Sequence, residues 1–209
     1  MTPILLYTWG TPNGQKASIM LEEVGLPYVV QAVDIGHGGS RTPEYLAMDP
    51  NGKIPLIEDR DAGRIVSESG AILLYLAERA GRMQPLPGSQ DLTWMFFQAA
   101  HVGPMLGQLG YFALRATEPS PDAVERFTEE ADRLLQVMER RLSIGDMPYL
   151  AGDEYTIADI ASYPWVMAAA TMMEEVLSST WDEVPAVQQW LERVGDRPAV
   201  QRGMRVLSP

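Results

Sequence analysis

Three short motifs in this chain combine residue types that bind anions and peptides. They are Thr-Pro-Asn-Gly at residues 11–14, Lys-Ile-Pro at 53–55 and Glu-Ser-Gly at 68–70. The first and third open helix-like runs, and backbone amides at a helix N-terminus bind anions. The Ile54-Pro55 bond can be cis, and a cis turn leaves the Ile54 N–H and C=O free to pair with a bound peptide like an added strand. The motifs therefore predict a site for a small peptide.

The elements that position these motifs follow from the pattern of the first 80 residues. Strand-like runs at residues 4–7 and 28–33 flank a helix-like run at 16–24. Two further strand-like runs, at 56–57 and 64–66, surround a turn-like segment and predict a hairpin. This βαβ and ββα order predicts a small α/β domain with the three motifs at one edge. The glycine-rich residues 36–40 are expected to form a mobile surface loop.

The remainder of the chain reads as helix after helix. We therefore predict a domain at residues 1–80, a proline-containing linker at 81–88 and an all-helical domain at 89–209. Residues 94–112 predict a long helix that Pro104 kinks, and residues 185–195 a final helix. Ser120-Pro121 begins a helix with an apolar stripe, and Thr156 and Asp159 form a capping box whose role is structural.

Composition narrows the classes of function. The net charge of -12 and the scattered basic residues argue against a nucleic-acid partner. The chain has no cysteine, so it carries no thiol nucleophile or thiolate metal site of its own. Its two histidines, His37 and His101, lie far apart in the sequence, so neither a metal site nor a Ser-His-Asp triad is expected. No apolar run approaches the roughly 20 residues that cross a bilayer, and the N-terminus lacks the order of a signal peptide, so we expect a cytoplasmic protein with no membrane partner.

Four motifs together resemble the glutathione transferase superfamily. They are the motifs at 11–14 and 53–55, Glu-Ser-Gly-Ala-Ile-Leu-Leu-Tyr-Leu at 68–76 and Thr-Ile-Ala-Asp-Ile-Ala at 156–161. Thr-Pro-Asn-Gly and Gly-Pro-Met-Leu-Gly-Gln at 103–108 further resemble the bacterial Nu class, whose members are glutathione-dependent disulfide-bond oxidoreductases. The resemblance implies a thioredoxin-like N-terminal domain, an all-helical C-terminal domain, a homodimer, glutathione as co-substrate and a site between the domains.

The resemblance also assigns residues to parts of glutathione. Glu68 and Ser69 are expected at the γ-glutamyl end, where a carboxylate pairs with the ammonium and a hydroxyl suits the α-carboxylate. Ser69 alone also fits a simple helix cap. Ile54, before a cis Pro55, is expected to pair its backbone with the cysteinyl part, although an ordinary tight turn is the alternative. Lys53 either holds the glycyl carboxylate or is a solvated lysine.

Thr11 and Asn13 are the candidates for activating sulfur, because a hydroxyl and an amide N–H₂ donate hydrogen bonds that favour a thiolate. A turn with an N-cap is the alternative interpretation of their motif. Tyr7 is a second candidate, since other classes of the superfamily use a tyrosine near the end of the first strand, but strand alternation aims it at the core.

The resemblance points to two further residues of the glutathione site, Ser40 and Arg133. The resemblance makes Ser40 a substrate-binding candidate, although it stands where the class is expected to have a glutamine that contacts glutathione. Arg133 resembles an arginine that reaches the glutathione of a neighbouring subunit, but a basic residue on an exposed helix face is usually solvated.

The leading hypothesis is an enzyme that stabilises the glutathione thiolate and uses it against small disulfides, hydroperoxides or electrophilic carbons. Because the chain has no cysteine, disulfide reduction requires a second glutathione to resolve the mixed disulfide. The alternative is a non-catalytic carrier of glutathione or of hydrophobic ligands, or an interaction module that retains the fold. Binding without turnover distinguishes a carrier from an enzyme.

Overall fold

The computed structural model describes residues 3–145 and 147–207, and their contacts divide the chain into two units. The first unit comprises the residues up to Gln84 together with those from Arg197 onward, and the second comprises Pro85–Asp196. The last helix of the chain therefore groups with the first unit, whereas the sequence had placed all of residues 89–209 in the helical domain.

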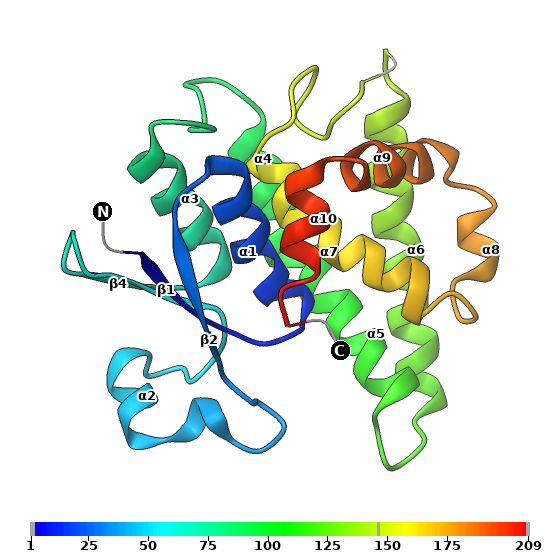
Figure 1. The fold of residues 1–209 in the computed structure, drawn as a ribbon. Helices are drawn as coiled ribbons and strands as arrows, with labels where there is room; N and C mark the ends of the chain where they lie inside the picture. Colours follow the sequence, from blue (N-terminus) through cyan, green and yellow to red (C-terminus); the bar gives the residue numbers. More distant parts are fainter. Residues whose placement is uncertain (1–2, 146, 208–209) are drawn as a thin grey trace. The chain divides into compact units, whose positions relative to one another are not determined.

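The first unit contains a four-stranded sheet with helices (Figure 1). Its elements are β1 (Ile4–Thr8), α1 (Pro12–Val24), β2 (Tyr28–Ala32), the 3₁₀ turn η1 (Gly39–Arg41), α2 (Pro43–Met48), β3 (Leu56–Asp59), β4 (Arg64–Ser67), α3 (Ser69–Ala80) and α10 (Pro198–Met204). The strand order is β2-β1-β3-β4, with β2 parallel to β1 and the other pairs antiparallel. The predicted βαβ and ββα order is confirmed, including the hairpin.

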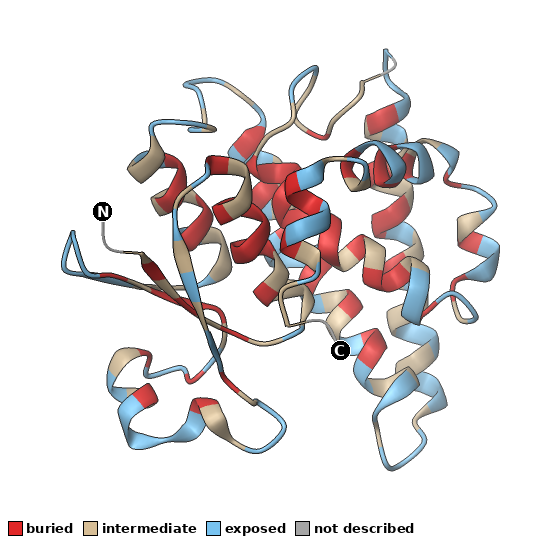
Figure 2. Cartoon of the chain, in the orientation of Figure 1, coloured by how far each residue is buried: buried red, intermediate tan, exposed pale blue. Residues whose placement is uncertain are grey.

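The two faces of this sheet differ in what covers them. Leu6 on β1 pairs with Ile57 on β3, and both side chains are fully buried on the face that carries α1 and α3. The middle of α1 is likewise buried (Figure 2). On the opposite face, Leu56 joins Val33 and Tyr45 in a smaller apolar cluster. Successive side chains of β1 thus point to opposite faces of the sheet, as expected for a β-strand.

The segment expected to be a mobile glycine-rich loop is more regular than predicted. The carboxylate of Asp34 accepts hydrogen bonds from the backbone N–H groups of Gly36 (2.9 Å) and His37 (3.2 Å), and Gly39 begins η1. A Cβ on Gly39 would lie 2.8 Å from the Asp34 carbonyl oxygen, so glycine permits a close turn here. The prediction of an irregular segment at 36–40 was therefore wrong at its C-terminal end.

The terminal helix α10 packs along α1. The buried Ser18 hydroxyl donates to the Gly203 carbonyl oxygen at 2.7 Å. At the end of α1, Arg197 forms a two-pronged ion pair with Glu23, with N–O distances of 2.8 and 2.9 Å. Glycine is required at the crossing, because a Cβ on Gly203 would lie 2.5 Å from Ile19 Cα.

We expect Gly203→Ala to lower the free energy of unfolding by about 2 kcal/mol, since a backbone atom blocks the added methyl group and the helices must separate. Urea unfolding followed by circular dichroism measures the change. Gly36→Ala is the control, because its added Cβ meets only the Asp34 side chain, at 3.2 Å. A change of less than about 0.5 kcal/mol is expected there. Equal stability of the two variants would contradict the tight crossing.

The second unit is helical in the part that the structure describes. Its elements are α4 (Asp91–Phe97), the π-helical turn η2 (Gln98–Val102), α5 (Gly103–Leu114), α6 (Pro121–Ser143), α7 (Ile157–Met172), α8 (Ser178–Trp181) and α9 (Pro185–Gly195). The predicted long helix thus spans α4, η2 and α5, with its deviation just before Pro104. Proline has no N–H for the preceding turn, which disrupts regular helical bonding there. In the described residues no helix is both long and apolar enough to cross a membrane.

Two predicted features stabilise the second unit. The apolar stripe of α6 is confirmed by the buried residues Ala131, Leu134 and Met138. The capping box is also confirmed, with Thr156 as N-cap of α7 and Asp159 at its third position. Asp159 is fully buried and also accepts hydrogen bonds from outside α7, so it links several segments of this unit.

Candidate functional site

A cavity of about 260 Å³ lies in the first unit, at the N-termini of α1 and α3 and beside the loop that precedes β3. All three motifs contribute to it. Its lining residues are Asn13, Asp49, Asn51, Lys53, Ile54, Pro55, Glu68 and Ser69. Six of these were candidates from the sequence, whereas Asp49 and Asn51 were not, because they belong to a loop without a recognisable motif.

Asn13 reaches the cavity because α1 begins directly against the end of β1. A Cβ on Gly14 would lie 2.3 Å from the Trp9 carbonyl oxygen, so only glycine allows this approach. Thr11 is the N-cap of α1, and its Oγ1 accepts a hydrogen bond from the Gly14 N–H at 3.3 Å. Asn13 is among the lining residues and Thr11 is not, but Thr11 is adjacent to the cavity in the same motif and its hydroxyl proton is not used by the cap.

The loop before β3 is held from two sides. The Lys53 N–H donates to Asp49 Oδ2 at 2.9 Å, and the Tyr45 hydroxyl donates to the Lys53 carbonyl oxygen at 2.7 Å. The Ile54-Pro55 peptide bond is cis. Across residues 3–145 and 147–207, no hydrogen-bond partner occurs for the Ile54 N–H or C=O. These groups are therefore available to an incoming peptide backbone.

Glu68 and Ser69 begin α3 at the same cavity. Glu68 is the residue before the helix and has φ 69° and ψ 118°, a conformation that non-glycine residues rarely adopt. Its side chain makes no capping hydrogen bond, and its carboxylate is exposed. Ser69 is the first residue of α3 rather than its N-cap. Neither side chain is therefore needed to cap the helix.

Sequence reasoning missed Lys16, which lies behind the cavity. Its side chain is 3% exposed, and its Nζ donates a hydrogen bond to Ser69 Oγ at 3.4 Å. Burial lowers the pKa of Lys16 to about 7, against the opposing effect of the Glu68 carboxylate. Its spacing from Asn13, three residues along α1, was the signal that could have identified it, since such residues share a helix face.

Ser40 does not line this cavity, and Arg133 belongs to the other unit. Ser40 is buried in η1, and its carbonyl oxygen faces Gly52, whose added Cβ would lie 2.8 Å away. It therefore supports the loop from behind. Arg133 lies in the second unit, where it forms an ion pair with Glu130 at 2.7 Å on the exposed face of α6. That geometry matches a solvated surface arginine within one chain.

Tyr7 is also not among the lining residues. Its hydroxyl donates to Glu58 Oε2 at 3.2 Å, and its ring packs edge-on against Tyr45. Burial, with the nearby Glu58 carboxylate, raises the pKa of the Tyr7 hydroxyl. Tyr7 thus has a structural role in the smaller apolar cluster rather than in the core beneath α1.

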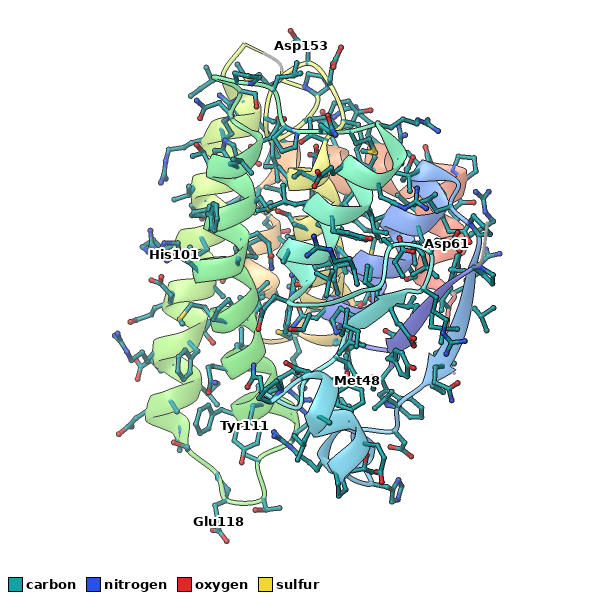
Figure 3. The ribbon with its side chains drawn as sticks, turned by 90° about the vertical axis from the view of Figure 1, so that its left-hand side faces the viewer. Met48, Asp61, His101, Tyr111, Glu118 and Asp153 are labelled. Carbon is teal, nitrogen blue, oxygen red and sulfur yellow. The ribbon has the colours of Figure 1, made fainter. Side chains whose placement is uncertain are left out.

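No imidazole lines the cavity. His37 pairs with Asp34 at 2.8 Å on the surface, and His101 projects outward from η2 (Figure 3). Among the described residues, no group of three or more acidic or histidine side chains is arranged to hold a metal ion. The side-chain groups that line the cavity are amides, a hydroxyl, the Lys53 ammonium and the carboxylates of Asp49 and Glu68.

The fold and the cavity together define a thioredoxin-like domain in which a cis-proline loop and two helix N-termini surround one cavity. The chain belongs to the glutathione S-transferase family. Residues 11–79 match the model of the glutathione S-transferase N-terminal domain, and residues 94–198 match that of the C-terminal domain. The resemblance to the glutathione transferase superfamily and the expected fold class are thereby confirmed.

Individual relatives agree over nearly the whole chain. Disulfide-bond oxidoreductase YfcG from Escherichia coli is 42% identical over 207 residues, which cover 95% of this chain and 93% of that protein. A solved glutathione transferase family member from Pseudomonas fluorescens, with two glutathione bound, is 39% identical, with a TM-score of 0.89 and coverage of 96% and 92%. A glutathione transferase from Pseudomonas putida, with one glutathione disulfide bound per subunit, is 37% identical, with a TM-score of 0.90 and coverage of 99% and 92%.

Proposed function

We propose that this protein is a glutathione-dependent disulfide-bond oxidoreductase of the bacterial Nu class. The observation that carries the proposal is the cavity in which Asn13, the unpaired Ile54 backbone and Glu68 with Ser69 meet. These groups match the thiol, the peptide backbone and the amino-acid end of glutathione. The names of relatives such as YfcG support the same reaction.

Each end of glutathione has a chemical partner in this cavity. The exposed Glu68 carboxylate pairs with the ligand ammonium, and the Ser69 hydroxyl and the first amides of α3 bind its α-carboxylate. The Ile54 N–H and C=O pair with the cysteinyl residue as a short added strand. Lys53 attracts the glycyl carboxylate. The ligand is thus oriented with its sulfur toward the N-terminus of α1.

Asn13 and Thr11 activate the sulfur without acting as bases. A free thiol has a pKa near 8.5, and hydrogen bonds to the thiolate lower that value. The Asn13 amide supplies such a donor at a helix N-terminus, where the helix dipole also favours negative charge. The Thr11 oxygen accepts from Gly14, so its hydroxyl proton remains available for donation. The chain needs no cysteine or histidine for this step.

The reaction consumes two glutathiones for each disulfide. The thiolate of the first attacks one sulfur of the substrate, which breaks the S–S bond, forms a mixed disulfide and releases one substrate thiolate that takes up a proton. The thiolate of the second glutathione attacks the glutathione sulfur of the mixed disulfide and releases the other substrate thiol. The products are glutathione disulfide and two thiols, so the two glutathiones supply both electrons.

The same proposal includes a cytoplasmic homodimer in which Arg133 approaches the glutathione of the neighbouring subunit. A glutathione-dependent reductase needs the reduced glutathione pool, which the cytosol maintains. Hydroperoxides and electrophilic carbons are further proposed substrates, because the same activated thiolate attacks them.

Reduction of a small symmetrical disulfide, coupled to glutathione reductase and NADPH consumption, tests the proposal. Turnover above the uncatalysed rate is expected with glutathione. It is expected to disappear when a dithiol without the γ-glutamyl group replaces glutathione, and in that arm release of the substrate thiol is followed directly, because an oxidised dithiol is not a substrate of glutathione reductase. Equal rates with the dithiol would contradict the mechanism. Glutathione binding without turnover of disulfides, hydroperoxides or electrophiles would instead identify a carrier.

A further inference from the structure

Lys16 is a buried charged residue for which the binding scheme above has no role. Its side chain is 3% exposed, although lysine is almost never fully buried without a specific partner. The chain uses arginine for 14 of its 16 basic residues, and its two lysines are Lys16 and the cavity-lining Lys53. At Lys16, where α1 passes behind the cavity, the chain thus has the compact ammonium of a lysine and not the guanidinium that it uses at most basic positions.

The hydrogen bond between Lys16 and Ser69 has a fixed direction. An ammonium group donates and cannot accept, so Ser69 Oγ is the acceptor in the 3.4 Å contact with Lys16 Nζ. The Ser69 hydroxyl proton must then be directed to another acceptor. Ser69 lines the cavity, so this proton is available to an anionic group bound there.

We propose that Lys16 is a positioning residue that acts through Ser69 to select the α-carboxylate of glutathione. Lys16 orients and polarises the Ser69 hydroxyl so that it donates to the carboxylate, and its buried positive charge adds long-range attraction. The proposal rests on the proposed function, because it concerns how the same cavity recognises glutathione.

The charges around Lys16 suit such a role. The nearby carboxylate is that of Glu68 on the α3 side, which favours the ammonium form. On the α10 side, Arg197 and Arg202 are ion-paired with Glu23 and Glu22, toward the other end of α1. Burial nevertheless lowers the pKa of Lys16 to about 7, because water solvates the buried ammonium poorly. A carboxylate bound in the cavity would favour the charged form of Lys16 by adding negative charge nearby.

The test compares two ligands on two proteins. The ligands are glutathione and 4-aminobutyryl-cysteinyl-glycine, which keeps the ammonium, the thiol and the glycyl carboxylate but lacks the α-carboxylate. Calorimetry with wild type and Lys16→Met is expected to show about a tenfold loss of affinity for glutathione in the variant and less than about a twofold loss for the analogue. Adding Ser69→Ala to Lys16→Met is expected to change little more, because the two residues act as one unit.

A second measurement covers the case in which Lys16→Met does not fold. In wild type labelled with ¹³C at lysine Cε, two lysine side-chain signals are expected. Both signals should move when glutathione binds, whereas the analogue should move only the Lys53 signal, since it retains the glycyl carboxylate. Equal losses for both ligands in Lys16→Met, or equal movement of the Lys16 signal, would overturn the inference alone. Failure of wild type to bind glutathione would overturn the proposed function with it.

Discussion

Asn13→Ala is expected to lower the turnover number for disulfide reduction about a hundredfold, because a single preorganised donor to a developing or stabilised anion contributes that much in other enzymes. Asn13 lines the cavity at the second position of α1, where the close contact between Gly14 and the end of β1 fixes the backbone that carries it. Glutathione binding is expected to weaken only about threefold, since the other contacts remain.

Three measurements separate these effects. Steady-state kinetics give the turnover number, calorimetry gives the dissociation constant for glutathione, and thiolate absorbance gives the pKa of the bound thiol, which should rise in the variant. Gln15→Ala is the matched control. Gln15 carries the same amide on the same helix, but its side chain donates to the Met204 carbonyl oxygen at 3.4 Å and does not line the cavity. Equal losses of binding and turnover in Asn13→Ala would show that Asn13 only positions the ligand.

Asp159→Ala is expected to lower the free energy of unfolding by about 4 kcal/mol, because it leaves several buried donors without an acceptor. Asp159 Oδ1 accepts from the indole N–H of Trp190 at 2.8 Å and from the Leu150 N–H at 3.0 Å. Its Oδ2 accepts from the Thr156 N–H at 3.0 Å. The control is Asp153→Ala, since Asp153 is exposed on a loop of the same unit (Figure 3).

The loss of stability in Asp159→Ala is also expected to depend on pH. Burial raises the pKa of Asp159 to about 6, above its ordinary 3.8, despite the hydrogen bonds that it accepts. Between about pH 4 and pH 6 the folded protein therefore keeps a proton that the unfolded chain has released, and the contribution of Asp159 to stability decreases as pH rises. Urea unfolding should show the gap between wild type and Asp159→Ala widening as pH falls from 6 to 4. A gap that is constant across this range would contradict the raised pKa.

The features that the sequence predicted well are those encoded within a few residues of each other. The strand-like run of β1, the apolar stripe of α6 and the capping box at Thr156 each depend on local composition, local periodicity or a cap. The motifs at 11–14, 53–55 and 68–70 each occur at an element boundary, which made their meeting at one cavity predictable from the strand and helix order.

The missed features depend on contacts between distant segments. The spacing from Asn13 places Lys16 on the same face of α1, but its hydrogen bond to Ser69 on another helix and its burial depend on tertiary packing. The role of Ser40 behind the loop depends on the close approach of Gly52. The helix α10 packs on α1 although the two helices lie near opposite ends of the sequence. Tertiary packing of this kind overrides residue type, as when a lysine becomes a buried residue.

The return of α10 to the first unit determines when that unit can be completed during protein synthesis. The surface of α1 around Ser18 and Ile19 is covered by Gly203, which the ribosome adds only after the whole second unit. At ordinary rates of translation, the interval between Gln84 and Arg197 is on the order of ten seconds. Compared with the second unit, the unit that carries the cavity thus begins synthesis earlier and is finished later, and a fragment ending at Gln84 would lack the helix that covers α1.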